Sequence, residues 1–256
     1  MTSRRKKEYV LPPNNEKSEY VKRNFDEISA GYDRFNDWIT FGMHRIWKRK
    51  TARATQIAAG KKELILDLCS GSGDITFMLH EEFPEAMIYA IDFSSGMLEI
   101  LKKKIMKRKL EGSIKIKKAD ITHLNFIRSG SVSAVTMGFG LRNVSQRERV
   151  MKEILRVLVP GGVYVNLDVG RVKGKLMAFF HKFYFEKIVP IIGFILHGGR
   201  HEMYRYLPAS ARNYPDQIKL KKELEKAGFK DINIKNFLFG SAAMHIAKKP
   251  TRKNKV

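Results

Sequence analysis

Short β-rich runs alternate with segments of helical periodicity through most of this 256-residue chain. Five such runs occur at residues 64–69, 87–92, 114–119, 132–139 and 163–168. Strands that are separated by helical segments do not pair as hairpins, so each joins the next through a crossover and the strands run parallel. The alternation therefore predicts an α/β fold built on a Rossmann-like, mostly parallel sheet.

Two further β-rich runs lie near the end of the chain, at residues 232–239 and 242–247. The gap between them is too short for a crossover helix, so they are expected to pair antiparallel. A closing antiparallel hairpin is absent from a plain dinucleotide-binding sheet. The expected hairpin therefore argues against a plain dinucleotide-binding fold for this chain.

Two helices are marked by their ends. A capping-box pattern at residues 145–148 predicts a helix that stops before Pro160. Later, Pro215 and Asp216 open a second helix, and Gly228 is placed as its C-terminal cap.

The first strand runs directly into a glycine-rich turn at residues 70–74, SGSGD. Gly71 and Gly73 lack the Cβ atoms that would keep a ligand away from the backbone, so a cofactor can approach it closely. Asp67 and Ser72 are therefore expected to be cofactor-binding residues with these glycines. Thr76 stands where the dinucleotide fingerprint has its third glycine, which disfavours NAD.

The next two strands also end in acidic residues. Asp92 can accept hydrogen bonds from ribose hydroxyls, and Asp120 can accept one from an adenine amino group while Ile121 packs on the ring. The carboxyl ends of parallel strands meet at one edge of the sheet, so these groups are expected to form one adenosine pocket. Alternatively, Asp92 and Asp120 could serve only to cap helices.

The chain is strongly basic, with 49 Lys and Arg against 26 Asp and Glu and a formal net charge of +23. Such a charge favours an anionic partner, either nucleic acid or an anionic membrane surface. It could equally serve solubility alone. The single cysteine, Cys69, excludes an internal disulfide, and no apolar signal core follows the basic start, so the cytoplasm is the expected compartment.

The fourth strand leads into FGLRNV at residues 139–144, and with it the chain resembles the ubiquinone/menaquinone biosynthesis C-methyltransferase family over about residues 20–249. Further matches are GYD at 31–33, FGMHRIWKR at 41–49, PDQ at 215–217 and AAMH at 242–245. The resemblance implies a class I S-adenosylmethionine-dependent methyltransferase fold, to which the closing hairpin also belongs.

The activity that the resemblance implies is C-methylation of a prenylated quinol with S-adenosyl-L-methionine. The substrate would be demethylmenaquinol, with the benzoquinol of the ubiquinone pathway as a second candidate. The AAMH segment favours the menaquinone branch. Gly138 aligns with a serine to which the family assigns cofactor contact, so it joins the expected cofactor-binding residues.

Three residues are expected to be catalytic. Arg142 and Asn143 leave the fourth strand beside the cofactor edge and offer a fixed cation and an amide to the quinol oxygen. The resemblance implies an acid–base role for this arginine through water. An arginine is a poor base because its pKa exceeds about 12, so stabilisation of the phenolate is favoured. Asp168 is a possible base or partner, and a purely structural salt bridge of Arg142 is the alternative.

Four residues are expected to bind the substrate: Tyr32, His44, Trp47 and His245. His44 and Trp47 lie about one helical turn apart and could form one wall of a pocket, although helix packing explains their spacing equally well. His245 could likewise be a packed core histidine. The motifs require no metal.

The segment 177–197 is rich in aromatic and aliphatic residues, but charged residues and Pro190 interrupt it, so it does not read as a membrane span. We expect a helical cover over the active site that meets the prenyl tail and the membrane interface. Packing on the core, or on a second subunit in a homodimer, is the alternative. The predicted location is therefore the inner membrane face, by peripheral association.

The expected organisation is a flexible basic tail at 1–17, one methyltransferase domain at 18–249 and a basic tail at 250–256. The domain would contain an N-terminal helical part at 18–60 and a substrate-covering helical insertion at 171–212. Two other functions stay open: a nucleic-acid methyltransferase and a non-catalytic scaffold for quinone-pathway enzymes. No base-stacking Pro-Pro-aromatic element follows the fourth strand, so no nucleic-acid partner is expected.

Overall fold

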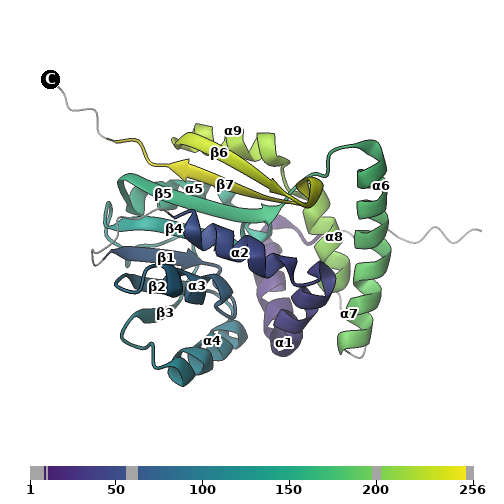
Figure 1. Cartoon of the computed structure of the whole chain (residues 1–256), viewed down its shortest axis with the longest axis horizontal. Coiled ribbons are helices and arrows are strands. Elements are labelled where there is room, and N and C mark those ends of the chain that lie inside the picture. The colour runs from purple at the N-terminus through teal and green to yellow at the C-terminus, as the bar shows by residue number, and fades with distance from the viewer. Residues whose placement is uncertain (1–8, 10, 56–62, 198–202, 252–256) are drawn as a thin grey trace, which may run out of the picture.

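The computed structural model describes residues 9, 11–55, 63–197 and 203–251. A seven-stranded sheet in the order β3-β2-β1-β4-β5-β7-β6 forms its centre (Figure 1). The strands are β1 (Leu64–Leu68), β2 (Met87–Asp92), β3 (Ile114–Lys118), β4 (Val132–Gly138), β5 (Leu158–Val169), β6 (Lys230–Phe237) and β7 (Ala242–Lys248). The first five pair parallel, whereas β7 pairs antiparallel with both β5 and β6. The predicted sheet and its closing hairpin are confirmed.

Helices cover both faces of the sheet. On one face, α2 (Met43–Arg53), α3 (Asp74–Glu82) and α4 (Ser95–Arg108) pack on side chains such as Ile65. On the other face, α5 (Arg147–Val157) and α9 (Gln217–Ala227) pack on side chains such as Leu66. Successive residues of a strand point to opposite faces, so one short apolar strand supplies both cores.

The remaining helices lie beyond the carboxyl ends of the parallel strands (Figure 1). They are α1 (Asn14–Thr40), α6 (Lys175–Phe183), a π-helical segment (Tyr184–Ile188), α7 (Val189–His197) and α8 (Met203–Asn213). Phe35 of α1, Val189 of α7 and Leu207 of α8 form a small apolar core of their own. These helices therefore form a cap over the edge at which such sheets bind ligands.

The predicted helix ends are partly confirmed. Asp216 accepts hydrogen bonds from the backbone N–H groups of Ile218 and Lys219, and Gly228 adopts the left-handed conformation that ends α9. The predicted capping box is wrong: α5 begins at Arg147, and its N-cap residue, Gln146, forms no side-chain capping bond.

Strand β5 begins at Leu158, five residues before the predicted start. The segment Pro160-Gly161-Gly162 reads as a turn, yet it lies within the strand. The pairing of β4 with β5 shifts register between Val132 and Ala134, and such an irregularity can accommodate a proline that cannot donate a ladder hydrogen bond.

Two further expectations need correction. The expected tail at 1–17 ends early, because α1 begins at Asn14 directly after Pro12 and Pro13, whose fixed backbone angles suit the start of a helix. The chain between β3 and β4, residues 119–131, contains turns where a crossover helix is expected. Residues 1–8 and 10, most of the C-terminal tail (252–256), and parts of the two helical regions (56–60 and 198–202) lie outside the described residues.

Candidate active site

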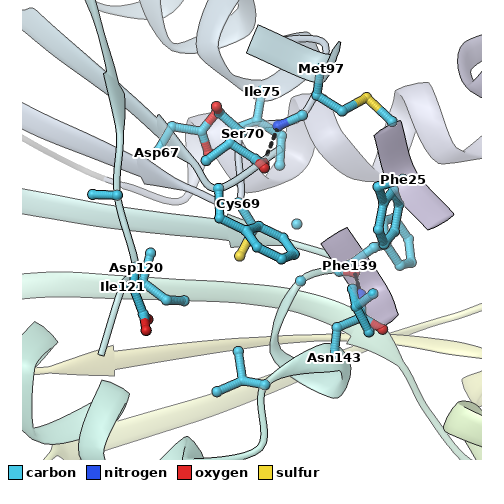
Figure 2. A pocket seen from close by; sticks show the side chains of 18 of the residues that line it. Phe25, Asp67, Cys69, Ser70, Ile75, Met97, Asp120, Ile121, Phe139 and Asn143 are labelled. Atoms are coloured by element: carbon cyan, nitrogen blue, oxygen red, sulfur yellow. Dashed lines mark hydrogen bonds between the residues drawn. The ribbon is translucent and has the colours of Figure 1, made fainter. Parts of the chain in front are cut away.

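A cavity of about 180 Å³ opens at the carboxyl ends of β1, β2 and β4 and beside the residues that follow β3. Most of the predicted cofactor-binding residues line it, namely Asp67, Gly71, Ser72, Asp92, Asp120, Ile121 and Gly138. Figure 2 shows Asp67 and Ser70 on one side of the space, Asp120 and Ile121 on a second, and Phe25, Phe139 and Asn143 on a third. Three strand ends thus converge on one hollow, as the sequence predicts.

Gly73 does not line this cavity. Its φ is +93°, and a Cβ added there would lie 2.3 Å from Cδ1 of Leu101. The structure therefore gives Gly73 a packing role, since it lets the turn lie directly against α4.

Asp92 holds the glycine turn in place. Its Oδ2 accepts a 2.8 Å hydrogen bond from the Gly71 N–H, and its Oδ1 accepts one of 2.9 Å from the Ser94 N–H. The side chain is buried, and burial raises its pKa. A carboxylate has about four acceptor positions, so acceptor capacity remains for a ribose hydroxyl. The helix cap of α4 comes instead from Ser94, whose hydroxyl accepts from the Met97 N–H.

Asp67 is a fully buried acid at the end of β1. The hydroxyls of Thr76 and Thr136 donate hydrogen bonds of 2.6 and 2.9 Å to its carboxylate. Burial nevertheless raises the pKa of Asp67 to about 6. Thr76, which breaks the dinucleotide fingerprint, is therefore the residue that fixes this acid at the cofactor cavity.

Asp120 and Ile121 close the far end of the cavity. Oδ1 of Asp120 accepts a 2.8 Å hydrogen bond from the Thr122 N–H, so the acid orders its own turn. It still faces the cavity, so its turn-forming and ligand-binding roles are compatible.

Helix α1 forms the outer wall of the cavity, which sequence reasoning missed. Ser18, Val21 and Phe25 line the space from this helix. Asp26 accepts from the Ser94 hydroxyl at 2.5 Å and from the Gly96 N–H at 3.0 Å, while Asp33 accepts from the Ser72 hydroxyl at 2.5 Å. The seven-residue spacing of the two acids places them on one helix face and is the available sequence signal.

A second, larger cavity of about 440 Å³ adjoins the first. Tyr32, Lys48 and Phe139 line both cavities and so mark their junction. The other residues around the second cavity are mostly apolar and come from α1, α2, the α6–α7 segment and the loop after β6. Among the predicted substrate-binding residues, Tyr32, His44 and Trp47 line this second cavity.

Arg142 reaches the second cavity from the short 3₁₀ turn Leu141–Asn143. Its side chain is buried, and Nη1 donates 2.9 Å hydrogen bonds to Oδ1 of Asp168 and to the Phe139 carbonyl. Asp168 also accepts from the Arg142 backbone N–H at 3.0 Å. Asp168 lines neither cavity, so the structure makes it an anchor for Arg142 and removes it from contact with a substrate.

Asn143 lines the cofactor cavity beside this pair. Its Oδ1 accepts a 3.0 Å hydrogen bond from the Tyr206 hydroxyl of α8, which fixes the amide. Lys17 of α1 donates to the Arg142 carbonyl at 3.1 Å, and burial lowers the pKa of Lys17 to about 8. Both contacts join the helical cap to the turn that carries the candidate catalytic residues.

His245 is not brought to either cavity. It is buried on β7, where Nε2 donates a 2.9 Å hydrogen bond to the Gln217 carbonyl. The expected substrate contact gives way to a packing role between the closing hairpin and α9. The Gln217 side chain, in turn, donates to the carbonyls of Arg171 and Gly240, which supports the loop beside the second cavity.

The residues around the first cavity fit S-adenosylmethionine. Asp92 and Asp120 supply acceptors at two ends of an adenosine-sized space, and Asp67 supplies a third acid for the ammonium group of the cofactor. A Cβ at Gly138 would lie 2.4 Å from Cδ1 of Ile75, so with Ile75 in this position the glycine keeps this part of the rim open. Among the described residues that line the first cavity, Lys48 supplies the basic side chain, and it can face the cofactor carboxylate.

Comparisons with known proteins agree with this assignment. The model of the ubiE/COQ5 methyltransferase family matches residues 14–249. The demethylmenaquinone methyltransferase of Leptospira interrogans serogroup Icterohaemorrhagiae serovar copenhageni is 43% identical over 245 residues, which are 96% of this chain and 98% of the relative. That of Geobacillus stearothermophilus is 39% identical over 236 residues, covering 91% of this chain and 98% of the relative.

A solved structure is similar in fold. It is a methyltransferase from Thermotoga maritima, described as S-adenosylmethionine-dependent and as a possible histamine N-methyltransferase. It has a TM-score of 0.60 and 16% sequence identity, and the match covers 89% of this chain and 99% of that one. At this identity the likeness concerns the fold alone.

Proposed function

Because the chain belongs to the ubiE/COQ5 methyltransferase family, we propose that it transfers the methyl group of S-adenosylmethionine to a ring carbon of demethylmenaquinol. The observation that carries the proposal is the junction of two cavities at Tyr32, Lys48 and Phe139. One cavity presents the acids that suit an adenosyl cofactor, and the other is apolar and large enough to admit a ring with the start of its prenyl tail.

The residues around the quinol cavity have distinct tasks in this reaction. S-adenosylmethionine supplies an electrophilic methyl group on a sulfonium. Arg142, which Asp168 holds in place, faces the quinol oxygen and stabilises the negative charge that this oxygen gains as its hydroxyl proton leaves. Asn143, held by Tyr206, offers an amide beside the same turn. The apolar walls keep water from the electrophile.

The test is a methyl-transfer assay with labelled S-adenosylmethionine and reduced quinones. Demethylmenaquinol should gain the label, and the same quinone in its oxidised form should not, because an oxidised ring lacks the electron-rich carbon. Labelling of the ubiquinone-pathway benzoquinol would extend the substrate range. Failure of every reduced quinone to gain methyl would overturn the proposed function.

Neither alternative function finds support. Both relatives named above are demethylmenaquinone methyltransferases, which speaks against a nucleic-acid substrate. The acids of the cofactor cavity are all present, which speaks against a non-catalytic scaffold.

An exposed apolar surface flanks the mouth of the quinol cavity, and we propose that it rests on an anionic membrane. Helices α6 and α7 expose Leu176, Phe179, Phe180, Phe183, Ile191, Phe194 and Ile195. Phe41 and Phe239, also strongly exposed, line the cavity itself, so apolar surface continues from the cavity to the outside. Exposed Lys175, Lys182 and Lys187 lie along the same segment and suit anionic headgroups.

The inner side of this segment packs on the protein, since Val189 is buried against Phe35 and Leu207. The segment thus packs on the core with one side, and its exposed apolar residues on the other side support the proposed membrane contact. No helix in the described part of the chain is long and apolar enough to cross a bilayer. The homodimer stays a prediction.

We expect the protein to bind anionic liposomes and to be released as salt rises, because charge attraction is screened over about 8 Å at physiological ionic strength. Cosedimentation with vesicles of anionic and of neutral lipid measures this. Replacing Phe179 and Phe183 by serine should weaken binding at every salt concentration, since both are exposed and line no cavity. Equal binding to neutral and anionic vesicles at low salt would refute the electrostatic part of the proposal.

A further inference from the structure

His44 is the buried histidine of the quinol cavity. It lies on α2, is 3% exposed and lines the cavity together with Trp47. In the described part of the chain, the buried side-chain atoms without a hydrogen-bond partner are Ser70 Oγ, His80 Nδ1 and His245 Nδ1. Nε2 of His44 also has no hydrogen-bond partner among the described residues, and its nearest charged neighbours are the carboxylates of Asp37 and Asp74.

The hydrogen bonds around His44 determine which ring nitrogen carries the proton. The Thr40 hydroxyl donates its single proton to the Asn36 carbonyl at 2.7 Å. Its oxygen lies 2.7 Å from Nδ1 of His44, and we assign the ring the tautomer in which an Nδ1–H group donates to this oxygen. The neutral ring is then unprotonated at Nε2, so a side chain that lines the quinol cavity carries a free hydrogen-bond acceptor.

Charged groups surround the same nitrogen. Nε2 lies 3.8 Å from Oδ1 of Asp37 on α1 and 4.0 Å from Oδ2 of Asp74 on α3. Both acids already have cationic partners, Arg45 for Asp37 and Lys48 for Asp74. Burial, followed by the charge of Lys48, lowers the pKa of His44 to about 4, while Asp74 and Asp37 oppose this shift. The imidazole is therefore neutral at neutral pH and available to accept a proton.

Other titratable groups of the cavity are less suited to that task. Arg142 stays protonated. Lys48 is paired with Asp74 at 2.7 Å, and the Tyr184 hydroxyl donates to the Ile39 carbonyl. His181 lies on α6, where its ring stacks on Phe185. His44 differs from these groups in having an open acceptor atom with two carboxylates within 4.0 Å.

We propose that Nε2 of His44 accepts the proton that methyl transfer releases and that Asp37 and Asp74 pass it to solvent. This inference rests on the proposed function. As the ring carbon bonds to the methyl group, the carbon–sulfur bond breaks and its electron pair stays on sulfur. The neighbouring phenolic O–H becomes strongly acidic, and its proton moves to Nε2. The proton on the methylated carbon then returns to the oxygen and restores the aromatic quinol.

A weak base suffices for this step, because the hydroxyl becomes acidic only as the new carbon–carbon bond forms. The two carboxylates near Nε2 stabilise the imidazolium once it exists. Asp37 is partly exposed, so a proton that reaches its carboxylate can leave to solvent. Arg142 and His44 thereby act together on the quinol oxygen, the arginine on its charge and the histidine on its proton.

The test combines substitution with chemical rescue. His44→Ala should lower turnover of demethylmenaquinol about a hundredfold, the usual contribution of a general base, while cofactor binding by calorimetry stays unchanged. Added imidazole should restore turnover, and the rescued rate should rise with pH through the pKa of the imidazole, because only its neutral form accepts a proton. His44→Gln keeps the side-chain volume and should be as slow as His44→Ala.

The controls separate this inference from the proposed function. His80→Gln, at a histidine of α3 that lines neither cavity, should keep wild-type turnover. Ring-nitrogen NMR of the wild-type protein should show His44 protonated at Nδ1. Wild-type turnover in both His44 variants, a loss that imidazole does not relieve, or a rescuable loss in His181→Ala alone would overturn the proposal. Absence of turnover in the wild-type enzyme would instead overturn the proposed function.

Discussion

Replacing Arg142 by alanine is expected to lower methyl transfer to demethylmenaquinol about a hundredfold to a thousandfold, the usual cost of removing one preorganised donor. Arg142 is held by Asp168 and the Phe139 carbonyl, so its charge is in position before the reaction begins. Cofactor affinity should change little, since the guanidinium lines the quinol cavity and not the cofactor cavity. Single-turnover kinetics and cofactor calorimetry measure the two effects separately.

The Arg142–Asp168 pair complicates this experiment, and a second variant resolves it. Arg142→Ala alone leaves Asp168, 1% exposed, without its cation, which typically costs about 3–5 kcal/mol of stability. Combining Arg142→Ala with Asp168→Asn removes both charges and should fold better while staying equally slow. Arg142→Lys should recover part of the rate, because lysine keeps the charge and loses the planar fork. A folded double variant with near-normal turnover would make the pair purely structural.

Asp92→Ala is expected to abolish most of the affinity for S-adenosylmethionine. The substitution removes the charged acceptor for ribose hydroxyls. It also releases the N–H groups of Gly71 and Ser94, so the glycine turn loses the side chain that holds it. Isothermal titration calorimetry measures the loss.

A matched variant separates the two roles of Asp92. Asp92→Asn keeps one carbonyl oxygen for the turn and loses the charge, so its affinity should lie between those of Asp92→Ala and the wild type. The cofactor assignment fails if Asp92→Ala, with an intact fold by circular dichroism, binds the cofactor as tightly as the wild type.

The sheet and the strand ends were open to prediction because their signals are local. An apolar run followed by a turn marks a strand, and the carboxyl ends of parallel strands meet at one edge. Asp67, Asp92 and Asp120 could therefore be placed at one cavity without coordinates. The short connection before β7 likewise predicts the antiparallel hairpin.

Long-range contacts were not predictable in this way. The pairing of Asp33 with Ser72 and of Lys17 with the Arg142 carbonyl joins residues 39 and 125 positions apart, and no local pattern announces either. The sequence leaves Asp168 as either a base or a partner of Arg142, and its burial against Arg142 favours the second role. His245 shows the same limit, since only packing against α9 reveals which way its ring faces.

Helix α1 runs unbroken for 27 residues and touches both ligand cavities. Phe25 faces the cofactor, Thr40 borders the quinol cavity, and Tyr32 belongs to both. Because α1 forms part of the wall of both cavities, a movement of this helix would change the cofactor cavity and the quinol cavity together. The binding of the two ligands would then be coupled through the position of α1. Thermodynamic reciprocity then requires that whatever factor the cofactor applies to quinol affinity, the quinol applies the same factor to cofactor affinity.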